Sequence, residues 1–368
     1  MSLELRVVPS IRDVDPLAWD ACAGRHPFVR HAFLSALEAS GAVCAARGVL
    51  PGYALLSDGP RGLVACAPVM QKSGTRREFG PEVRWLSAGS AAGCFAWPKF
   101  QVGLPFFPVM GPKLLARGGP AADAQRAALL VGLREWRRKS GDDVFNIMHI
   151  DARQARQCRA AGALLSCEWH SHWANAGHRT YADYLLALPA RKRRQARIDR
   201  HQAESHQLEF RVLRGRDIRD EVLADYYDGH RRVCSRHGGR PWLPEEAYRA
   251  VVAAMPEAAI LMAYADAGKF VAGILGLEQD GELYLLQWSE RATLAGLAMD
   301  LVCFRPIEYA IHNGLRRVDS GLDAGHKRFR DWQPVPVYQA HWFFNDELRR
   351  LAEREVEAIQ VPQPIAID

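Results

Sequence analysis

Apolar and polar residues alternate along two stretches of this chain, and turn residues interrupt each stretch. The first covers residues 52–70 and contains Asp58-Gly59-Pro60. The second covers residues 259–288 and contains two turns that end in glycine, at 266–268 and 279–281. Alternation with a period of two is typical of strands, and turns of the Asp-Gly type join antiparallel neighbours. The pattern therefore predicts a β-hairpin in the first half of the chain and a three-stranded meander in the second.

A helical pattern follows each of these stretches. Helices are predicted at residues 122–139 and 296–312, and the glycine just beyond each of them is the usual C-terminal stop. Short strands are predicted next, at residues 144–150 and 316–319. The order hairpin, helix, strand thus occurs twice, which predicts an α+β fold made by tandem duplication.

The length of the chain agrees with this duplication. A chain of 368 residues exceeds the size at which a single core is usual, so two domains are expected. We place the N-terminal domain at residues 1–168 and the C-terminal domain at residues 169–368. A further helix is predicted at residues 345–359, followed by a frayed tail.

Composition narrows the class of protein. Apolar residues make up 48% and charged residues 24%, values typical of globular proteins, and no apolar run is long enough to cross a bilayer. The N-terminus carries acidic residues where a signal peptide needs a long apolar stretch, so a cytoplasmic location is expected. The eight cysteines are scattered without a CxxC pair, which argues against a zinc ribbon or a disulfide framework. The net charge of +6 favours acidic partners such as phosphates without requiring nucleic acid.

The segment 318–341 concentrates groups that could perform chemistry. Its glycines allow a close backbone approach to a ligand, and Asp319, Asp323, His326, Lys327 and Arg330 supply proton-transfer and anion-binding groups. Charged loops are also common on protein surfaces, so the alternative is a solvated turn.

A basic run at residues 191–200 forms a second candidate. On a helix, Arg193, Arg197 and Arg200 lie on one side and could hold the phosphates of a coenzyme or of RNA. The alternative is a solvated helix face.

Other residues offer weaker indications. His170 and His172 share one side of a predicted strand, but no third ligand lies at a recognisable spacing, so a metal site is not predicted. Trp173 and Asn175, just beyond them, could line a pocket. Phe106 and Phe107 lie in a proline-rich loop at 104–115, either as a ligand wall or as a packed connection. The serine-hydrolase, P-loop and zincin motifs are absent.

The small residues around Gly296 precede a predicted helix, and the free N–H groups of a helix N-terminus bind anions. The pyrophosphate of acyl-CoA occupies such a turn in GNAT enzymes, but the spacing Arg291–Ala298 departs from their pattern. Donor binding at Gly296 is therefore only weakly indicated.

Four stretches in order along the chain resemble the FemAB-like predicted N-acyltransferases, a peptidoglycan biosynthesis and recognition group of the GNAT superfamily. They cover residues 27–41, 97–115, 170–200 and 307–334. The resemblance implies two GNAT-like domains, mixed and mostly antiparallel sheets flanked by helices, and transfer of an acyl or aminoacyl group to an amine.

The chain departs from the family pattern at several positions. The family histidine is missing from residues 74–80, and the family's Glu-His-Lys becomes Gly325-His326-Lys327. The residues that remain and that the resemblance implicates in substrate or donor binding are Lys99, Trp173, Asn175, Trp288, Arg330 and the basic helix, with an acid kept at Asp300.

Chemistry of this kind needs a base and an oxyanion donor, with no covalent enzyme intermediate and no tightly bound cofactor. We expect His326 or Asp300 as the base, and Lys327 and Arg330 as oxyanion or phosphate ligands. Two co-substrates remain open as the donor, acyl-CoA and aminoacyl-tRNA. The acceptor is an amine-bearing small molecule or cell-wall precursor. The rival hypothesis is a catalytically silent scaffold that recognises cell-wall fragments or nucleic acid.

Overall fold

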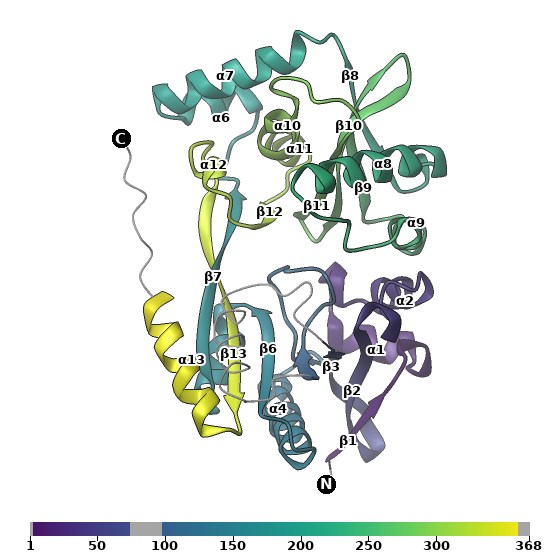
Figure 1. Ribbon diagram of the computed structural model, residues 1–368, viewed down its shortest axis with the longest axis vertical. Coiled ribbons are helices and arrows are strands. Elements are labelled where there is room, and N and C mark those ends of the chain that lie inside the picture. The colour runs from purple at the N-terminus through teal and green to yellow at the C-terminus, as the bar shows by residue number, and fades with distance from the viewer. Residues whose placement is uncertain (1–2, 74–97, 360–368) are drawn as a thin grey trace. The chain divides into compact units, whose positions relative to one another are not determined.

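The computed structural model of the chain describes residues 3–73 and 98–359, and it divides into two compact units (Figure 1). Unit 1 comprises residues 1–38, 43–168 and 336–368, and unit 2 comprises residues 39–42 and 169–335. The main division at 168/169 lies where the sequence placed it. The C-terminal segment from residue 336 differs from the expectation, because it belongs to unit 1 and not to the second domain.

Unit 1 contains a mixed sheet with the order β1-β2-β3-β4-β6-β13. Its strands are β1 (Leu3–Val8), β2 (Val49–Asp58), β3 (Gly62–Lys72), β4 (Lys99–Val102), β5 (Leu115–Ala116, paired with β3), β6 (Val144–Ile150) and the main part of β13 (Gln333–Phe343). Its helices are α1 (Pro16–Ala23), α2 (His31–Ala39), α4 (Ala122–Lys139), α5 (Ala152–Ala160) and α13 (Asp346–Ile359).

Unit 2 contains a sheet with the order β7-β12-β11-β10-β9-β8. Its strands are the end of β7 (Leu164–Ala174), β8 (Glu209–Arg214), β9 (Ala259–Asp266), β10 (Lys269–Gln279), β11 (Glu282–Glu290) and β12 (Arg317–Leu322). Its helices are α6 (Tyr181–Ala187), α7 (Ala190–Glu204), α8 (Asp220–Arg236), α9 (Glu245–Ala254), α10 (Leu297–Met299), a π-helical turn (Asp300–Phe304), α11 (Arg305–His312) and α12 (Gly325–Arg328).

The duplication is visible in the order of elements. The series β1, α1, α2, β2, β3, β4, α4, β6, α5, β7 matches β8, α8, α9, β9, β10, β11, α10–α11, β12, α12, β13. The halves also exchange their last strands, since β13 pairs with β6 and β7 pairs with β12. This exchange explains why the C-terminal segment belongs to unit 1. The tandem duplication inferred from the sequence is confirmed.

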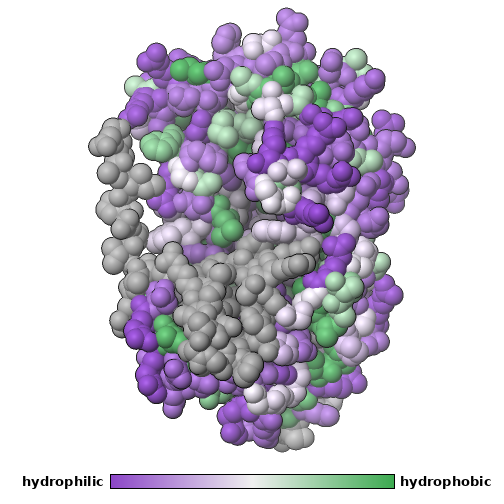
Figure 2. All heavy atoms as spheres, in the orientation of Figure 1, coloured by the Kyte–Doolittle hydropathy of each residue, from purple (hydrophilic) through white to green (hydrophobic). Residues whose placement is uncertain are grey.

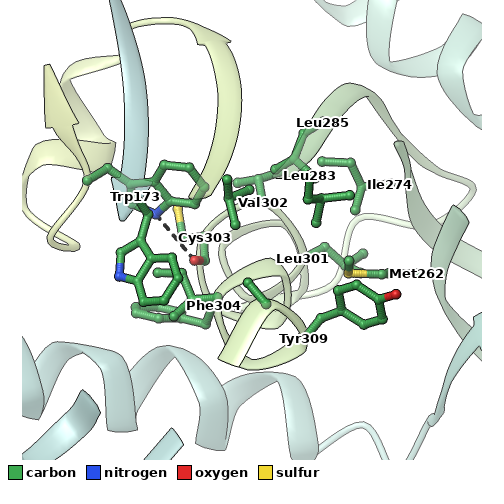
Figure 3. Packing of buried hydrophobic residues seen from close by; sticks show 14 of the residues in the cluster. Trp173, Met262, Ile274, Leu283, Leu285, Leu301, Val302, Cys303, Phe304 and Tyr309 are labelled. Atoms are coloured by element: carbon green, nitrogen blue, oxygen red, sulfur yellow. Dashed lines mark hydrogen bonds between the residues drawn. The ribbon is translucent and has the colours of Figure 1, made fainter. Parts of the chain in front are cut away.

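The core of unit 2 gathers apolar side chains from the sheet and from the helices on one of its faces (Figure 3). Ile260, Met262 and Tyr264 alternate along β9 and face this core, as the two-residue period of a strand requires. Helices α8 and α9 cover the other face, where Tyr226 packs edge-on against Phe270 at a centroid distance of 6.2 Å.

Most predicted elements have the expected bounds. The hairpin, the meander, the basic helix and the C-terminal helix are confirmed, and α4 and β6 begin and end at the predicted residues. The predicted helix 296–312 is instead α10, the π-helical turn and α11 in succession. Phe106 and Phe107 are 4% and 3% exposed, and Phe107 packs against Phe28 and Phe33. The packed-connection alternative for residues 104–115 is therefore correct.

Within the described residues, no helix has both the length and the apolar character needed to cross a membrane. Hydrophilic residues make up most of the coloured surface on the face shown in Figure 2. The seven cysteines in the described part of the chain are free thiols, and Cys94 lies outside that part. The segment 74–80, where the family histidine is missing, and the predicted frayed tail at 361–368 also lie outside the described residues.

A close approach of α8 to β11 gives a test of this packing. A Cβ at Gly229 would overlap Ser289 Oγ and lie 3.0 Å from the carbonyl carbon of Glu290. Gly229→Ala is expected to lower the free energy of unfolding by about 1–3 kcal/mol, because the helix must move off the strand. Denaturant unfolding measures the change. Gly118→Ala is the control, because a Cβ there meets nothing within 4 Å. Equal stability of both variants would contradict the packing.

Candidate functional site

A cavity of about 670 Å³ lies within unit 2, where two parallel strands separate. The parallel pairing of β11 with β12 covers only the three residue pairs from Glu282–Arg317 to Tyr284–Asp319. Beyond them, Leu285–Trp288 of β11 and Ser320 of β12 line the cavity. Clefts at separating strands are common ligand sites in mixed sheets, so this cavity is the candidate site.

His326 and Lys327 bring two polar side chains to this cavity from the short helix α12. Lys327 is 9% exposed, and its Nζ donates to Ser320 Oγ at 2.6 Å and lies 5.4 Å from the centre of the Trp332 ring. Burial lowers the pKa of Lys327, while Cys303, Asp319 and Asp323 act in the opposite direction. The sequence prediction that both residues belong to one site is consistent with this geometry.

His326 has the protonation behaviour that a base requires. Partial burial, together with the neighbouring cations Lys327 and Arg330, lowers its pKa below the usual 6.5, against a smaller opposing effect of Asp323. The imidazole is therefore neutral at pH 7 and has a free lone pair for a proton.

Hydrogen bonds to β7 hold the loop that carries these residues. Ser320 Oγ donates to the Ser171 carbonyl at 3.0 Å, and the Asp323 N–H donates to the Trp169 carbonyl at 2.8 Å. Asp323 also accepts from Ser171 Oγ and from Arg328. Asp323, predicted as a ligand-binding residue, therefore anchors the loop.

Helix α8 supplies a wall of the cavity that the sequence reading did not identify. His230 and Cys234 line the cavity, as do Arg240, Trp242 and the predicted Trp288. His230 Nδ1 lies 3.1 Å from the Trp288 carbonyl, which can only accept, so the neutral ring presents Nε2 to the Cys234 thiol at 3.5 Å. The i, i+4 spacing of this pair on an amphipathic helix was the available signal.

Asp300 is held by two guanidinium groups and does not line the cavity. It is 0% exposed, Arg200 Nε donates to its Oδ1 at 2.7 Å, and Arg305 Nε donates to its Oδ2 at 3.0 Å. Tyr264 also donates to Oδ2, and Glu308 accepts from both arginines. A carboxylate paired in this way is a poor general base, so the structure favours a packing role for Asp300 in place of the expected catalytic one.

The basic helix α7 presents a different cationic face from the predicted one. Arg200 is ion-paired with Asp300 and Glu308, and Arg193 donates to the Leu186 carbonyl at 3.0 Å, so Arg197 is the member of the predicted stripe with neither kind of contact among the described residues. Arg191, Arg194 and Arg197 are exposed, and within residues 3–73 and 98–359 they have no ion-pair partner. Spaced three residues apart, they form the accessible cationic face of α7, which we call the α7 face.

Gly296 and Arg330 fix α7 to the rest of unit 2. Gly296 has φ +77°, and a Cβ there would lie 2.6 Å from Gln202 Cβ and 2.8 Å from the Asp199 carbonyl oxygen. Helix α7 therefore packs directly against the backbone at Gly296. Arg330 Nε donates to Asp199 at 2.8 Å, so its guanidinium is also paired.

Three further predicted binding residues lie away from the cavity lining. Trp173 is 2% exposed within the core of unit 2 (Figure 3), and Asn175 Oδ1 accepts from the N–H groups of Gly177 and His178 in a turn. Lys99 is 1% exposed on β4 of unit 1. There, burial and the Lys99 cation lower the pKa of His341 to about 3.

The role of Asp300 can be tested by stability. Asp300→Asn is expected to lower the free energy of unfolding by about 3 kcal/mol, because it leaves two buried guanidinium groups without their main counter-charge. Denaturant unfolding measures the loss. Asp225→Asn breaks an exposed pair with Arg291 and serves as the control, with an expected loss of about 0.2–1 kcal/mol. Full stability of Asp300→Asn with loss of turnover would instead support the catalytic role.

Comparisons with known proteins agree with this architecture. The C-terminal domain of a protein from Agrobacterium fabrum, assigned as a lysylphosphatidylglycerol synthetase, is 11% identical with a TM-score of 0.58, covering 94% of this chain and 97% of that one. FemX is 10% identical with a TM-score of 0.56, covering 96% and 100%. L-PGS from Bacillus licheniformis is 11% identical with a TM-score of 0.54, covering 89% and 95%. At these identities the likeness concerns the fold.

A comparison with curated protein sequences finds no match. The FemAB-like family model, described as peptidoglycan biosynthesis/recognition, matches residues 10–362. The chain therefore belongs to the FemAB-like family, which places it among acyl and aminoacyl transferases.

Proposed function

We propose that the cavity of unit 2 is the active site for transfer of an acyl or aminoacyl group from an activated ester or thioester donor to an amine. The observation that carries the proposal is the position of His326 and Lys327 on one side of a cavity whose other walls are largely apolar. Ile274, Leu285 and Val302 offer surface to the carbon chain of the group transferred.

The reaction needs only groups that this site provides. The neutral His326 imidazole accepts a proton from the attacking amine as the C–N bond forms. The Lys327 amine donates a hydrogen bond to the oxygen of the tetrahedral intermediate, which it can do in either protonation state. The C–O or C–S bond then breaks, and His326 returns the proton to the leaving oxygen or sulfur.

Direct transfer fits this site better than an acyl-enzyme. Cys234 is the nucleophilic side chain of the cavity wall, and burial raises the pKa of its thiol. A thiol protonated at neutral pH is a weak nucleophile, even with His230 beside it.

The α7 face favours aminoacyl-tRNA as the donor. Arg191, Arg194 and Arg197 are three exposed cations without counter-charges in the described part of the chain, an arrangement suited to a phosphate backbone. The competing acyl-CoA donor has less support, because the spacing Arg291–Ala298 departs from the GNAT pattern and α7 packs against Gly296. Family membership supports a peptidoglycan precursor as the amine acceptor.

His326→Ala tests the base. Turnover is measured by mass spectrometry with a panel of aminoacyl-tRNA and acyl-CoA donors, and we expect a loss of about 10²–10⁴-fold. His312→Ala, which removes an exposed histidine of α11, should retain turnover. Full activity of His326→Ala would remove the imidazole from the mechanism.

The pH profile gives a second readout. The base is the neutral form of His326, and its pKa lies below 6.5, so the rate should stay level near pH 7 and fall only as the pH drops through that lowered value. Partial burial and the cations Lys327 and Arg330 lower this value, and Asp323 opposes them. Arg240, His230 and His237 are further charged or titratable groups of the cavity wall. The residual activity of His326→Ala should not show this fall in rate at low pH.

The donor is tested by binding. A variant with Arg191, Arg194 and Arg197 changed to glutamine should bind tRNA more weakly, with the slope of log affinity against log salt reduced by about two to three units. Arg153, Arg156 and Arg159, exposed on α5, give a control of equal charge when changed likewise. Stabilisation by CoA together with unchanged tRNA binding would identify the thioester donor. Binding without turnover of any donor would identify a silent scaffold.

A further inference from the structure

Two histidines and a carboxylate meet in the interior of unit 2, outside the cavity lining. His170 and His172 lie on β7 and are 0% and 4% exposed, and Asp319 lies on β12 and is 2% exposed. One nitrogen from each ring and one oxygen of Asp319 all lie within 4.8 Å of one another. The sequence offered no third ligand because Asp319 is distant along the chain.

The pairing of β7 with β12 brings these three side chains together. Asp319 is the direct partner of His172 across the two antiparallel strands, so both side chains lie on the same face of the sheet. His170 is two residues away on β7 and therefore lies on that face as well. A register shift between Asp319 and Leu322 places Leu322 opposite His170.

Gly321 at this irregularity orients the carboxylate. It has φ +70°, a conformation that glycine adopts without strain, and its N–H donates to Asp319 Oδ1 at 2.8 Å. Oδ2 is then left to face His172, whose Nε2 lies 3.2 Å away. A hydrogen bond that fixes a carboxylate in this manner is typical of the residues around metal ligands.

The distances suit a small divalent ion. Tetrahedral ligands about 2.0–2.1 Å from zinc lie about 3.3 Å from each other, close to the observed 3.2 Å between His172 and Asp319. The ligand nitrogen of His170 lies within 4.8 Å of both atoms, so it would complete the set by moving toward them when the ion binds. Two imidazoles and one carboxylate are ligands that suit Zn²⁺ better than Mg²⁺ or Ca²⁺, which prefer sets of oxygen atoms.

We propose that His170, His172 and Asp319 form a binding site for a transition-metal ion of the Zn²⁺ type. Such an ion would join β7 to β12. These two strands pair because the halves of the chain exchange their last strands. It would also fix Ser320, the next residue after Asp319, whose Oγ accepts from Lys327. The site thus supports the loop of the cavity and takes no part in the transfer chemistry.

The full chain, purified without added chelator and dialysed, tests the proposal by elemental analysis. We expect about one Zn²⁺ per chain, or uptake of one Zn²⁺ on titration, with a rise in the melting temperature that a chelator reverses. His172→Gln and Asp319→Asn should each lose this uptake and this rise. His201→Ala, which removes an exposed histidine of α7, should keep both.

Cobalt provides a measurement on the unaltered chain, in case a variant fails to fold. Replacement by Co²⁺ should give the strong visible absorption bands of a four- or five-coordinate site. The alternative is a plain ion pair between protonated His172 and Asp319. Absence of Zn²⁺ uptake, of thermal stabilisation and of cobalt bands in the wild-type chain would establish that alternative and overturn the proposal. Uptake unchanged in both ligand variants would overturn it as well.

Discussion

In unit 2, β11 and β12 run parallel for three residue pairs and then diverge, and the cavity exists because of this divergence. Over these same residues β12 also pairs with β7, from Arg317–Ala174 to Asp319–His172, and after a register shift Leu322 pairs with His170. Serine hydroxyls and backbone N–H groups then continue the contact with β7. Because the loop is held on that side, α12 turns Lys327 back against Ser320 and beside the open space.

The opposite end of the site depends on a buried electrostatic network. Asp300 begins the π-helical turn and binds Arg200 of α7 and Arg305 of α11. A π-helical turn displaces the residues that follow it, and such turns are frequent near functional sites. Here Val302, within the turn, lines the cavity, while Asp300 faces the arginines. One short segment therefore serves both the packing of α7 and the shape of the cavity.

The sequence predicted regular elements well because their signals are local. The hairpin, the meander and α4 follow from alternation, helical spacing and glycine stops, which depend only on neighbouring residues. The strand exchange could not be predicted, because nothing in the pattern of β13 distinguishes β6 from β12 as its partner. His326 and Lys327 were predicted because one short loop concentrates charged residues, and both line the cavity. His230 and Cys234 were missed because their place in the site depends on how α8 packs against β11.

Charge alone did not show which side chains are already ion-paired, because the partners are distant in sequence. Arg200, Arg330 and Asp300 were selected as chemically active groups, yet each is paired with a residue distant in sequence. Helical spacing gives the side of a helix on which an arginine lies, but it does not say whether that side meets solvent or a carboxylate. The α7 face became recognisable only when Arg193 and Arg200 were assigned to their partners.

The duplicated fold contains a parallel pairing of the same length twice, but the residues beyond the two pairings differ. In unit 1, β4 and β6 are also parallel for three pairs, from Phe100–Phe145 to Val102–Ile147. The next residues are Gly103 and Met148, and a Cβ at Gly103 would lie 3.3 Å from the Met148 Cβ. Methionine thus occupies the position that corresponds to Ser320, and its flexible apolar side chain fills space beside the strands. In unit 2 the corresponding residue, Ser320, is polar and lines the cavity proposed as the active site.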